Sequence, residues 1–122
     1  SAPIIAALWR TNSKDTEPTL RASALSRLVS APAEMARAKQ KLKLLLGGKD
    51  EAAFVAEQAL ARAGDESVAP ALDQHLAKDG VDHRRLAALA LLDLKRYSEV
   101  ASALADEHPR VRASIACEIV QR

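Results

Sequence analysis

The strongest constraint on the fold is a phrase that the chain contains near both of its ends. The segment HPRVRASIACEI, residues 108–119, closely matches EPTLRASALSRL, residues 17–28. Two weaker copies lie between them, at residues 55–63 and 84–92, and the aligned positions are 35, 29 and 27 residues apart. Self-similarity at steps of about 20–50 residues is typical of repeat proteins. The chain is therefore predicted to contain one helical unit four times.

Composition indicates that the repeated unit is helical. Hydrophobic residues make up 48% of the chain and aromatic residues only 2%, so the core must consist mainly of Ala, Leu, Val and Ile. Ala and Leu are strong helix formers, and a charged fraction of 28% is enough to solvate the outer faces of amphipathic helices. Apolar spacings of three and four residues place a second helix before each copy. The predicted helix pairs are 2–10 with 17–29, 32–46 with 50–63, 66–77 with 82–95, and 98–105 with 109–121.

These pairs are predicted to form one repeat domain over residues 1–122. The repeats would cover roughly residues 1–30, 31–64, 65–96 and 97–122. One helix pair cannot bury its own apolar face, so we expect successive pairs to stack on one another. The chain begins at Ser1 rather than Met, and we expect it to be a fragment of a longer protein. Since neither end shows a polar cap, further repeats or self-association through the ends are expected.

The segment GDESVAPALDQHLAKDGVDHRRLAALALL, residues 64–92, resembles a HEAT repeat of the PBS-lyase-like type. In that family an Asp in the turn precedes an Arg of the second helix by six residues, and the two bond between repeats to form a ladder. The candidate ladder residues here are Asp15 with Arg21, Asp79 with Arg85, Asp106 with Arg112, and Asp50, whose counterpart is Ala56. The resemblance implies an all-α fold, an α-solenoid of about four HEAT-like helix pairs and about eight helices. A helical bundle with solvated ion pairs is the alternative.

The resemblance also implies that the second helix of each pair lines the concave side of the solenoid. Polar residues on these helices are therefore candidates for a face that grips a segment of another protein. The candidates are Ser23, Arg27, Gln58, Arg62, Arg110, Ser114 and Glu118. The other interpretation is that these polar stripes are solvated helix faces.

One predicted first helix carries a run of cations without an acid. Arg37, Lys39, Lys41 and Lys43 form a candidate basic patch for nucleic-acid phosphates or an acidic peptide. A net charge of +2 and the lack of interleaved aromatic residues favour a protein partner over nucleic acid. A solvated outer face is the simpler interpretation of the run.

No catalytic, cofactor-binding or metal-binding residues are predicted, and we expect no cofactor. The histidines His75, His83 and His108 lack the Cys or carboxylate spacing of a metal site. Cys117 aligns with small residues of the other copies, which is typical of a packed thiol. Bilin lyases with HEAT-like repeats keep an enzyme or enzyme accessory of that type as an alternative, and a nucleic-acid-binding helical-repeat protein is another.

We expect a protein-protein interaction or scaffolding module without catalytic activity of its own. The longest apolar run, Leu44–Leu46, is too short to cross a bilayer, so no membrane insertion is predicted. We also expect a cytoplasmic location.

Overall fold

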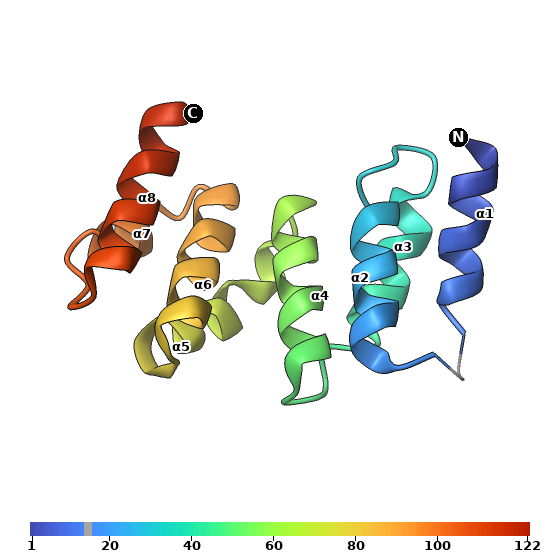
Figure 1. The fold of residues 1–122 in the computed structure, drawn as a ribbon, viewed down its shortest axis with the longest axis horizontal. Helices are drawn as coiled ribbons and strands as arrows, with labels where there is room; N and C mark the ends of the chain where they lie inside the picture. The colour runs from blue at the N-terminus through green and yellow to red at the C-terminus, as the bar shows by residue number, and fades with distance from the viewer. Residues whose placement is uncertain (14–15) are drawn as a thin grey trace. The chain divides into compact units, whose positions relative to one another are not determined.

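The computed structural model describes residues 1–13 and 16–122, which are helical with short connecting turns (Figure 1). No strand occurs in these ranges, and the prediction of an all-α protein is confirmed. The contacts divide the chain into two compact units, Ser1–Ala63 and Gly64–Arg122. Over the same described ranges, no helix has both the length and the apolar character needed to cross a membrane.

The first unit is built from two helix pairs in the residues described. They are α1 (Ala2–Thr11) with α2 (Pro18–Leu28), and α3 (Met35–Lys43) with α4 (Glu51–Arg62). Helix α2 packs against α1, α3 and α4, and α3 also packs against α4. The second helices of the two pairs are thus direct neighbours, as Figure 1 shows for α2 and α4.

The second unit follows the same pattern. A 3₁₀ turn, η1 (Glu66–Val68), leads into α5 (Ala69–Lys78), which is followed by α6 (Val81–Asp93), α7 (Tyr97–Ala103) and α8 (Pro109–Gln121). Helix α6 packs against α5, α7 and α8, and α7 also packs against α8. In both units, therefore, the second helix of the first pair contacts the other three α-helices.

Helix α3 is shorter than the predicted helix 32–46 because the chain is wound more tightly at both of its ends. The amide of Glu34 donates to the carbonyl oxygen of Ala31 at 2.9 Å, and the amide of Leu45 donates to that of Leu42 at 2.9 Å. Bonds between residues three apart are typical of 3₁₀ turns, which pair backbone groups that an α-helix end leaves open.

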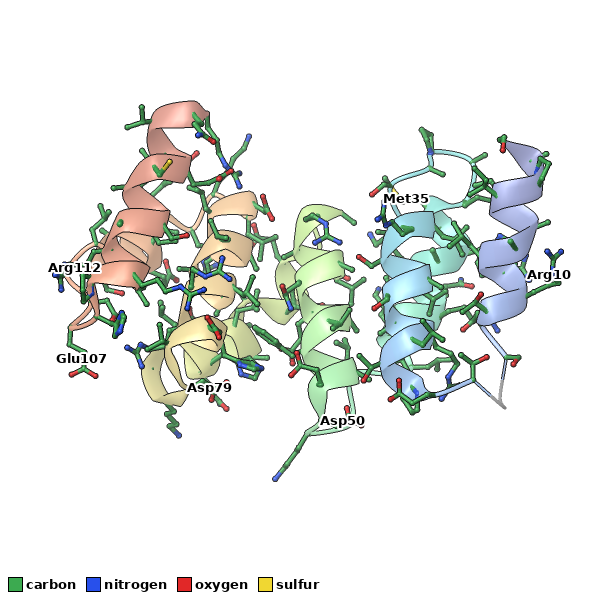
Figure 2. All side chains as sticks on the ribbon, viewed as in Figure 1. Arg10, Met35, Asp50, Asp79, Glu107 and Arg112 are labelled. Atoms are coloured by element: carbon green, nitrogen blue, oxygen red, sulfur yellow. The ribbon has the colours of Figure 1, made fainter. Side chains whose placement is uncertain are left out.

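Carboxylate side chains cap both second helices of the first unit. Asp50 Oδ1 accepts a hydrogen bond from the amide of Ala53 at 3.1 Å, at the start of α4 (Figure 2). The Glu17 carboxylate accepts from the amides of Thr19 at 3.0 Å and Leu20 at 3.1 Å, at the start of α2. The bond from Thr19 is the main reason that the pKa of Glu17 lies below its ordinary value. Asp50, a candidate ladder residue, is thus the N-cap of α4.

Alanine and aliphatic side chains make up most of the core of each unit. The largest fully buried side chains are Leu25, Leu28, Leu42, Phe54 and Leu60 in the first unit, and Leu72, Leu91, Val100, Val111 and Ile115 in the second. Ala22, Ala38, Ala59 and Ala87 are fully buried as well. Because alanine is small, it lets helix backbones lie close together and leaves little space for larger residues.

Candidate functional site

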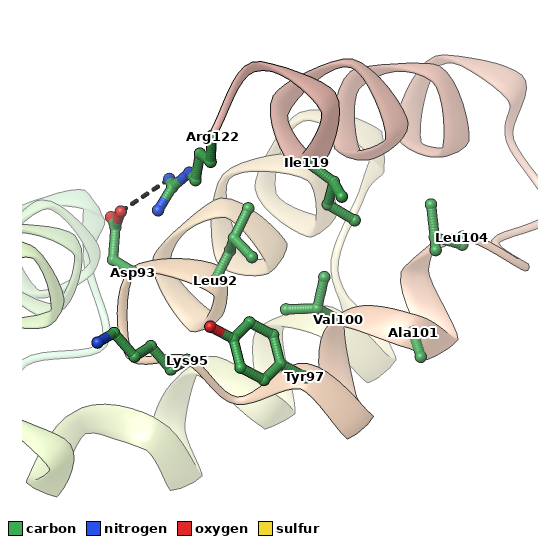
Figure 3. A pocket seen from close by; sticks show the side chains of 9 residues that line it. All are labelled: Leu92, Asp93, Lys95, Tyr97, Val100, Ala101, Leu104, Ile119 and Arg122. Atoms are coloured by element: carbon green, nitrogen blue, oxygen red, sulfur yellow. Dashed lines mark hydrogen bonds and ion pairs between the residues drawn. The ribbon is translucent and has the colours of Figure 1, made fainter.

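A pocket of about 410 Å³ lies in the second unit, between the end of α6, helix α7 and the last turns of α8 (Figure 3). Its lining consists of Leu92, Tyr97, Val100, Ala101, Leu104 and Ile119, with Asp93, Lys95 and Arg122 as charged members. In Figure 3 the charged side chains lie to one side, and Ala101 and Leu104 lie to the other. The pocket therefore has a charged end, formed by Asp93, Lys95 and Arg122, and an apolar end near Leu104.

The way in which α6 ends determines where the charged residues lie. The amide of Arg96 donates to the carbonyl oxygen of Leu91 at 2.9 Å, and the amide of Lys95 donates to that of Leu92 at 3.0 Å. These bonds define a Schellman motif, in which the residue after the C-cap is left-handed and is usually glycine. Here that residue is Lys95, with a φ of 60°. The motif stops α6 and allows α7 to begin at Tyr97.

The pocket combines a buried apolar lining with exposed apolar walls. Leu92 and Val100 are only 5% and 2% exposed, whereas Tyr97, Leu104 and Ile119 are 62%, 42% and 41% exposed. Large apolar side chains that remain exposed around a concave site are typical of surfaces that bind a ligand or a partner. This cluster therefore identifies the pocket as the candidate binding site.

At the charged end, two carboxylates hold Arg122. Its Nη2 lies 2.8 Å from Asp93 Oδ1, and its Nε lies 3.4 Å from Glu118 Oε1. Burial lowers the pKa of Arg122, but the hydrogen bonds and charges of Asp93 and Glu118 outweigh burial and hold this pKa above its ordinary value. Lys95 is exposed and forms no ion pair with any residue that the structure describes. Lys95 is thus the cation whose charge a ligand can meet most directly.

A second group of charged residues connects the turns that precede α6 and α8. Arg84 donates to the Asp106 carboxylate from Nε at 2.9 Å and from Nη2 at 3.0 Å, and its Nη1 donates to the carbonyl oxygen of Asp79 at 2.9 Å. Arg112 Nη1 donates to the carbonyl oxygen of Asp106 at 2.6 Å. Figure 2 shows Asp79, Glu107 and Arg112 in this part of the unit.

The arginine that links these turns is Arg84, whereas the six-residue spacing predicted Arg85. Arg84 and Arg112 are each the fourth residue of their helices, which begin at Val81 and Pro109. The turn from the aspartate to the helix is one residue shorter before α6 than before α8. Position along the helix, rather than distance from the aspartate, therefore decides which arginine reaches the turn.

Among the residues that the structure describes, the other candidate ladder residues do not form a regular series of pairs. Arg21 Nε and Arg85 Nε are buried and have no hydrogen-bond partner among the residues described. The carboxylate of Asp79 contacts the ring of His75, with 2.5 Å between Oδ2 and Nδ1. Asp15 lies outside the described residues.

Four candidates for the concave face lie in the first unit. Arg62 donates to the hydroxyl of Ser26 and so links α4 to α2. Gln58 Nε2 donates to a backbone carbonyl of its own helix at 3.3 Å. Ser23 and Arg27 are exposed on α2. Two of the four therefore already have partners within the unit.

The remaining three candidates lie on α8 in the second unit. An Arg110 nitrogen is 3.4 Å from Asp82 Oδ1, and both side chains are well exposed. Ser114 is half-buried. Glu118 contacts Arg122 and thereby lies next to the charged end of the pocket. Of the seven candidates, Glu118 is the one that the structure connects to this site among the residues described.

The candidate basic patch on α3 is divided between two sides of the helix. Residues four apart share a helix face, so Arg37 lies with Lys41 and Lys39 lies with Lys43. The buried stripe of α3, which contains Ala38, separates the two pairs. The cations therefore flank the buried face instead of forming one basic outer side.

Arg37 also has an aromatic partner. Its Cζ lies 3.9 Å from the centroid of the Trp9 ring, a distance at which cation and ring attract each other. Trp9 Nε1 donates to Glu34 Oε2 at 3.0 Å. These contacts join α1 to the start of α3.

Over residues 1–13 and 16–122, no group of three or more His, Cys, Asp or Glu side chains is arranged to hold a metal ion. Comparison with protein families, with curated proteins and with solved structures gives no match. The pocket geometry is therefore the basis for inferring function.

The pocket is not evident from the sequence, although Ile119 was expected on the uncapped apolar face of the last helix pair. Leu104 and Ile119 occur at apolar positions of predicted helices, where periodicity assigns them to a core. A weak signal was present at Tyr97, the single tyrosine of the chain, which directly follows Lys95 and Arg96. An aromatic residue after two cations is compatible with a binding site, but it does not reveal a pocket.

Proposed function

We propose that the chain is a helical-repeat protein-binding module whose pocket receives a large apolar side chain of a partner protein. The observation that carries this proposal is the exposure of Tyr97, Leu104 and Ile119 around a pocket with a buried apolar lining. Removing a Leu or Phe side chain from water contributes roughly 1.5–3 kcal/mol. One such anchor supplies a substantial part of the affinity of a peptide, and its flanking residues supply the rest.

We also infer a HEAT-like α-solenoid of four helix pairs as the scaffold. The phrase that recurs in the second helices supports this inference, because it gives each pair the same apolar face to bury. The packing within each unit supports it as well, since α2 contacts α4 and α6 contacts α8. A solenoid of this kind offers extended surfaces for partner proteins.

The geometry of α3 favours a protein over nucleic acid as the partner. Its four cations lie on two sides of the helix, and Arg37 is stacked on Trp9. Single-stranded nucleic acids are held by a continuous basic groove with aromatic rings on which bases stack. Here the one tryptophan of the chain is covered by Arg37 and bonded to Glu34.

Selection from a library of displayed random peptides tests the proposal. The 122-residue chain serves as the immobilised target, and isothermal titration calorimetry gives the Kd of each enriched peptide. We expect the enriched peptides to share a large aliphatic or aromatic residue. Ile119→Asp places a charge in the pocket wall and should weaken binding by about tenfold or more, equivalent to about 1.4 kcal/mol.

Leu44→Asp is the matched control, because it introduces the same charge at an exposed apolar residue of the first unit. It should leave the Kd within about twofold of the wild-type value. Circular dichroism establishes that both variants keep their helix content. Enriched peptides without an apolar anchor, or equal binding to Ile119→Asp and the wild type, would show that the proposal is wrong.

A further inference from the structure

At the charged end of the pocket, one cation is held by two acids and the other is not paired within the described residues. Lys95 and Arg122 are its cations, and Asp93 is its acid. Asp93 is bonded to Arg122, whose other carboxylate partner is Glu118. Lys95 makes no ion pair within the described part of the chain. The charge that remains for a ligand is thus positive and belongs to Lys95.

The backbone at Lys95 determines where its side chain begins. Its φ of 60° lies in the left-handed region, which glycine adopts at lower cost than any residue with a side chain. The Schellman motif fixes Lys95 at the end of α6, so its ammonium group extends from a rigid part of the pocket rim.

We infer that the pocket recognises a protein segment in which a carboxylate lies close in sequence to the large apolar anchor. This inference rests on the proposed function, because the anchor is the side chain that fills the pocket. The anchor packs against Leu104 and Ile119 at the apolar end, while an Asp or Glu of the same segment pairs with Lys95. Arg122 is the second cation within this end, and the ligand carboxylate competes for it with Asp93.

Three synthetic peptides of equal length, blocked at both termini, test the inference. They share one Phe anchor and differ only in the residues that flank it, which are Glu, Gln or Lys. We expect the 122-residue chain to bind the Glu peptide about tenfold more tightly than the Lys peptide, with the Gln peptide between them. Added salt should narrow this difference, because ions screen charges that are exposed to solvent.

Variants of the charged end separate the roles of its residues. Lys95→Gln should bring the three Kd values together, whereas Lys49→Gln, which removes an exposed lysine of the first unit, should not. Asp93→Asn should have the opposite effect. It removes the acid that competes for Arg122, so the Glu peptide should bind more tightly while the Gln peptide changes little.

The outcomes distinguish this inference from the proposed function. Equal affinity for all three peptides, or a preference for the Lys peptide, would overturn the inference and leave the proposed function intact. If none of the three binds the wild-type chain, both are overturned. If no peptide binds, sedimentation velocity tests whether the chain associates with itself. Self-association that Ile119→Asp abolishes would make the pocket an interface between copies of the chain.

Discussion

The Asp106 carboxylate accepts two hydrogen bonds from the Arg84 guanidinium, at 2.9 and 3.0 Å, and the two side chains are only 9% and 14% exposed. The same guanidinium bonds the backbone of Asp79. One side chain thus ties the turn before α6 to the turn before α8. Hydrogen bonds between charged partners in this two-point geometry are stronger than those between neutral groups.

Asp106→Ala should lower the free energy of unfolding by roughly 1.5–3 kcal/mol, because it leaves the guanidinium without its charged partner. Urea denaturation followed by circular dichroism measures the change. Glu107→Ala is the control, since Glu107 is 89% exposed and lies 3.9 Å from Arg84. Its effect should stay within about 0.5 kcal/mol. Similar losses in the two variants would show that the two-point pair does not stabilise the turns.

The same pair should make stability depend on pH in the acid range. The hydrogen bond from Arg84 is the main cause that holds the pKa of Asp106 below its ordinary value. The unfolded chain then takes up the proton more readily, so the stabilisation is complete above the unfolded pKa of about 3.9 and is lost as pH falls through the folded pKa. The wild-type Tm should fall more steeply there than that of Asp106→Asn. Parallel curves would contradict the assignment.

Asp73→Asn should stabilise the protein at neutral pH. Burial raises the pKa of Asp73, with the charge of Glu99 as a further cause, and Arg96 opposes them. Asp73 Oδ1 is buried without a hydrogen-bond partner among the residues described. Because folding raises the pKa of Asp73, the free energy of unfolding is highest below the unfolded pKa of about 3.9. It falls as pH rises through the folded pKa.

The check for Asp73→Asn is the urea midpoint measured at two pH values. The midpoint should rise at about pH 7, where the wild-type Asp73 carboxyl is charged. It should change little below the ordinary aspartate pKa of about 3.9. A lower midpoint at neutral pH would mean that the carboxylate has a favourable partner.

Asp50→Ala should cost about 1 kcal/mol, because it removes the cap that pairs with the amide of Ala53. Asp50→Ser keeps an acceptor oxygen at this position and should retain most of the stability. Differential scanning calorimetry compares the two variants. If serine proves as harmful as alanine, Asp50 stabilises the first unit by some means other than capping.

Lys95→Gly should stabilise the protein by about 1 kcal/mol, because glycine adopts the left-handed conformation without the steric cost of a side chain. It should also abolish the preference for the Glu peptide. Lys95→Ala separates the two effects, since it removes the charge but keeps the cost. Urea denaturation and peptide titration measure both properties, and a loss of stability in Lys95→Gly would contradict the backbone argument.

The repeat and the apolar spacing were enough to place the second helices. The predicted ranges 17–29, 50–63, 82–95 and 109–121 agree with α2, α4, α6 and α8 to within two residues at each end. Apolar spacing did not decide the rotation of α6, because leucines such as Leu86 and Leu91 lie around much of this helix. Apolar spacing alone was therefore compatible with both Arg84 and Arg85, and the structure shows that the arginine at the fourth position of the helix reaches the turn.

The pocket was beyond sequence analysis for a different reason. The exposure of Leu104 and Ile119 depends on what packs against α7 and α8, and their helical spacing is the same as that of core residues. The left-handed backbone of Lys95 was also hidden, since turn prediction relies on glycine at such positions. Both features arise from tertiary packing around the end of α6.

The single tryptophan and the single tyrosine of the chain fall in different units. Trp9 lies against Arg37 in the first unit, and Tyr97 lines the pocket in the second. Tryptophan fluorescence will therefore report on the first half of the molecule, and tyrosine absorbance on the ligand site in the other half. Each half carries its own optical probe, so melting of one and ligand entry into the other can be followed in the same unlabelled sample.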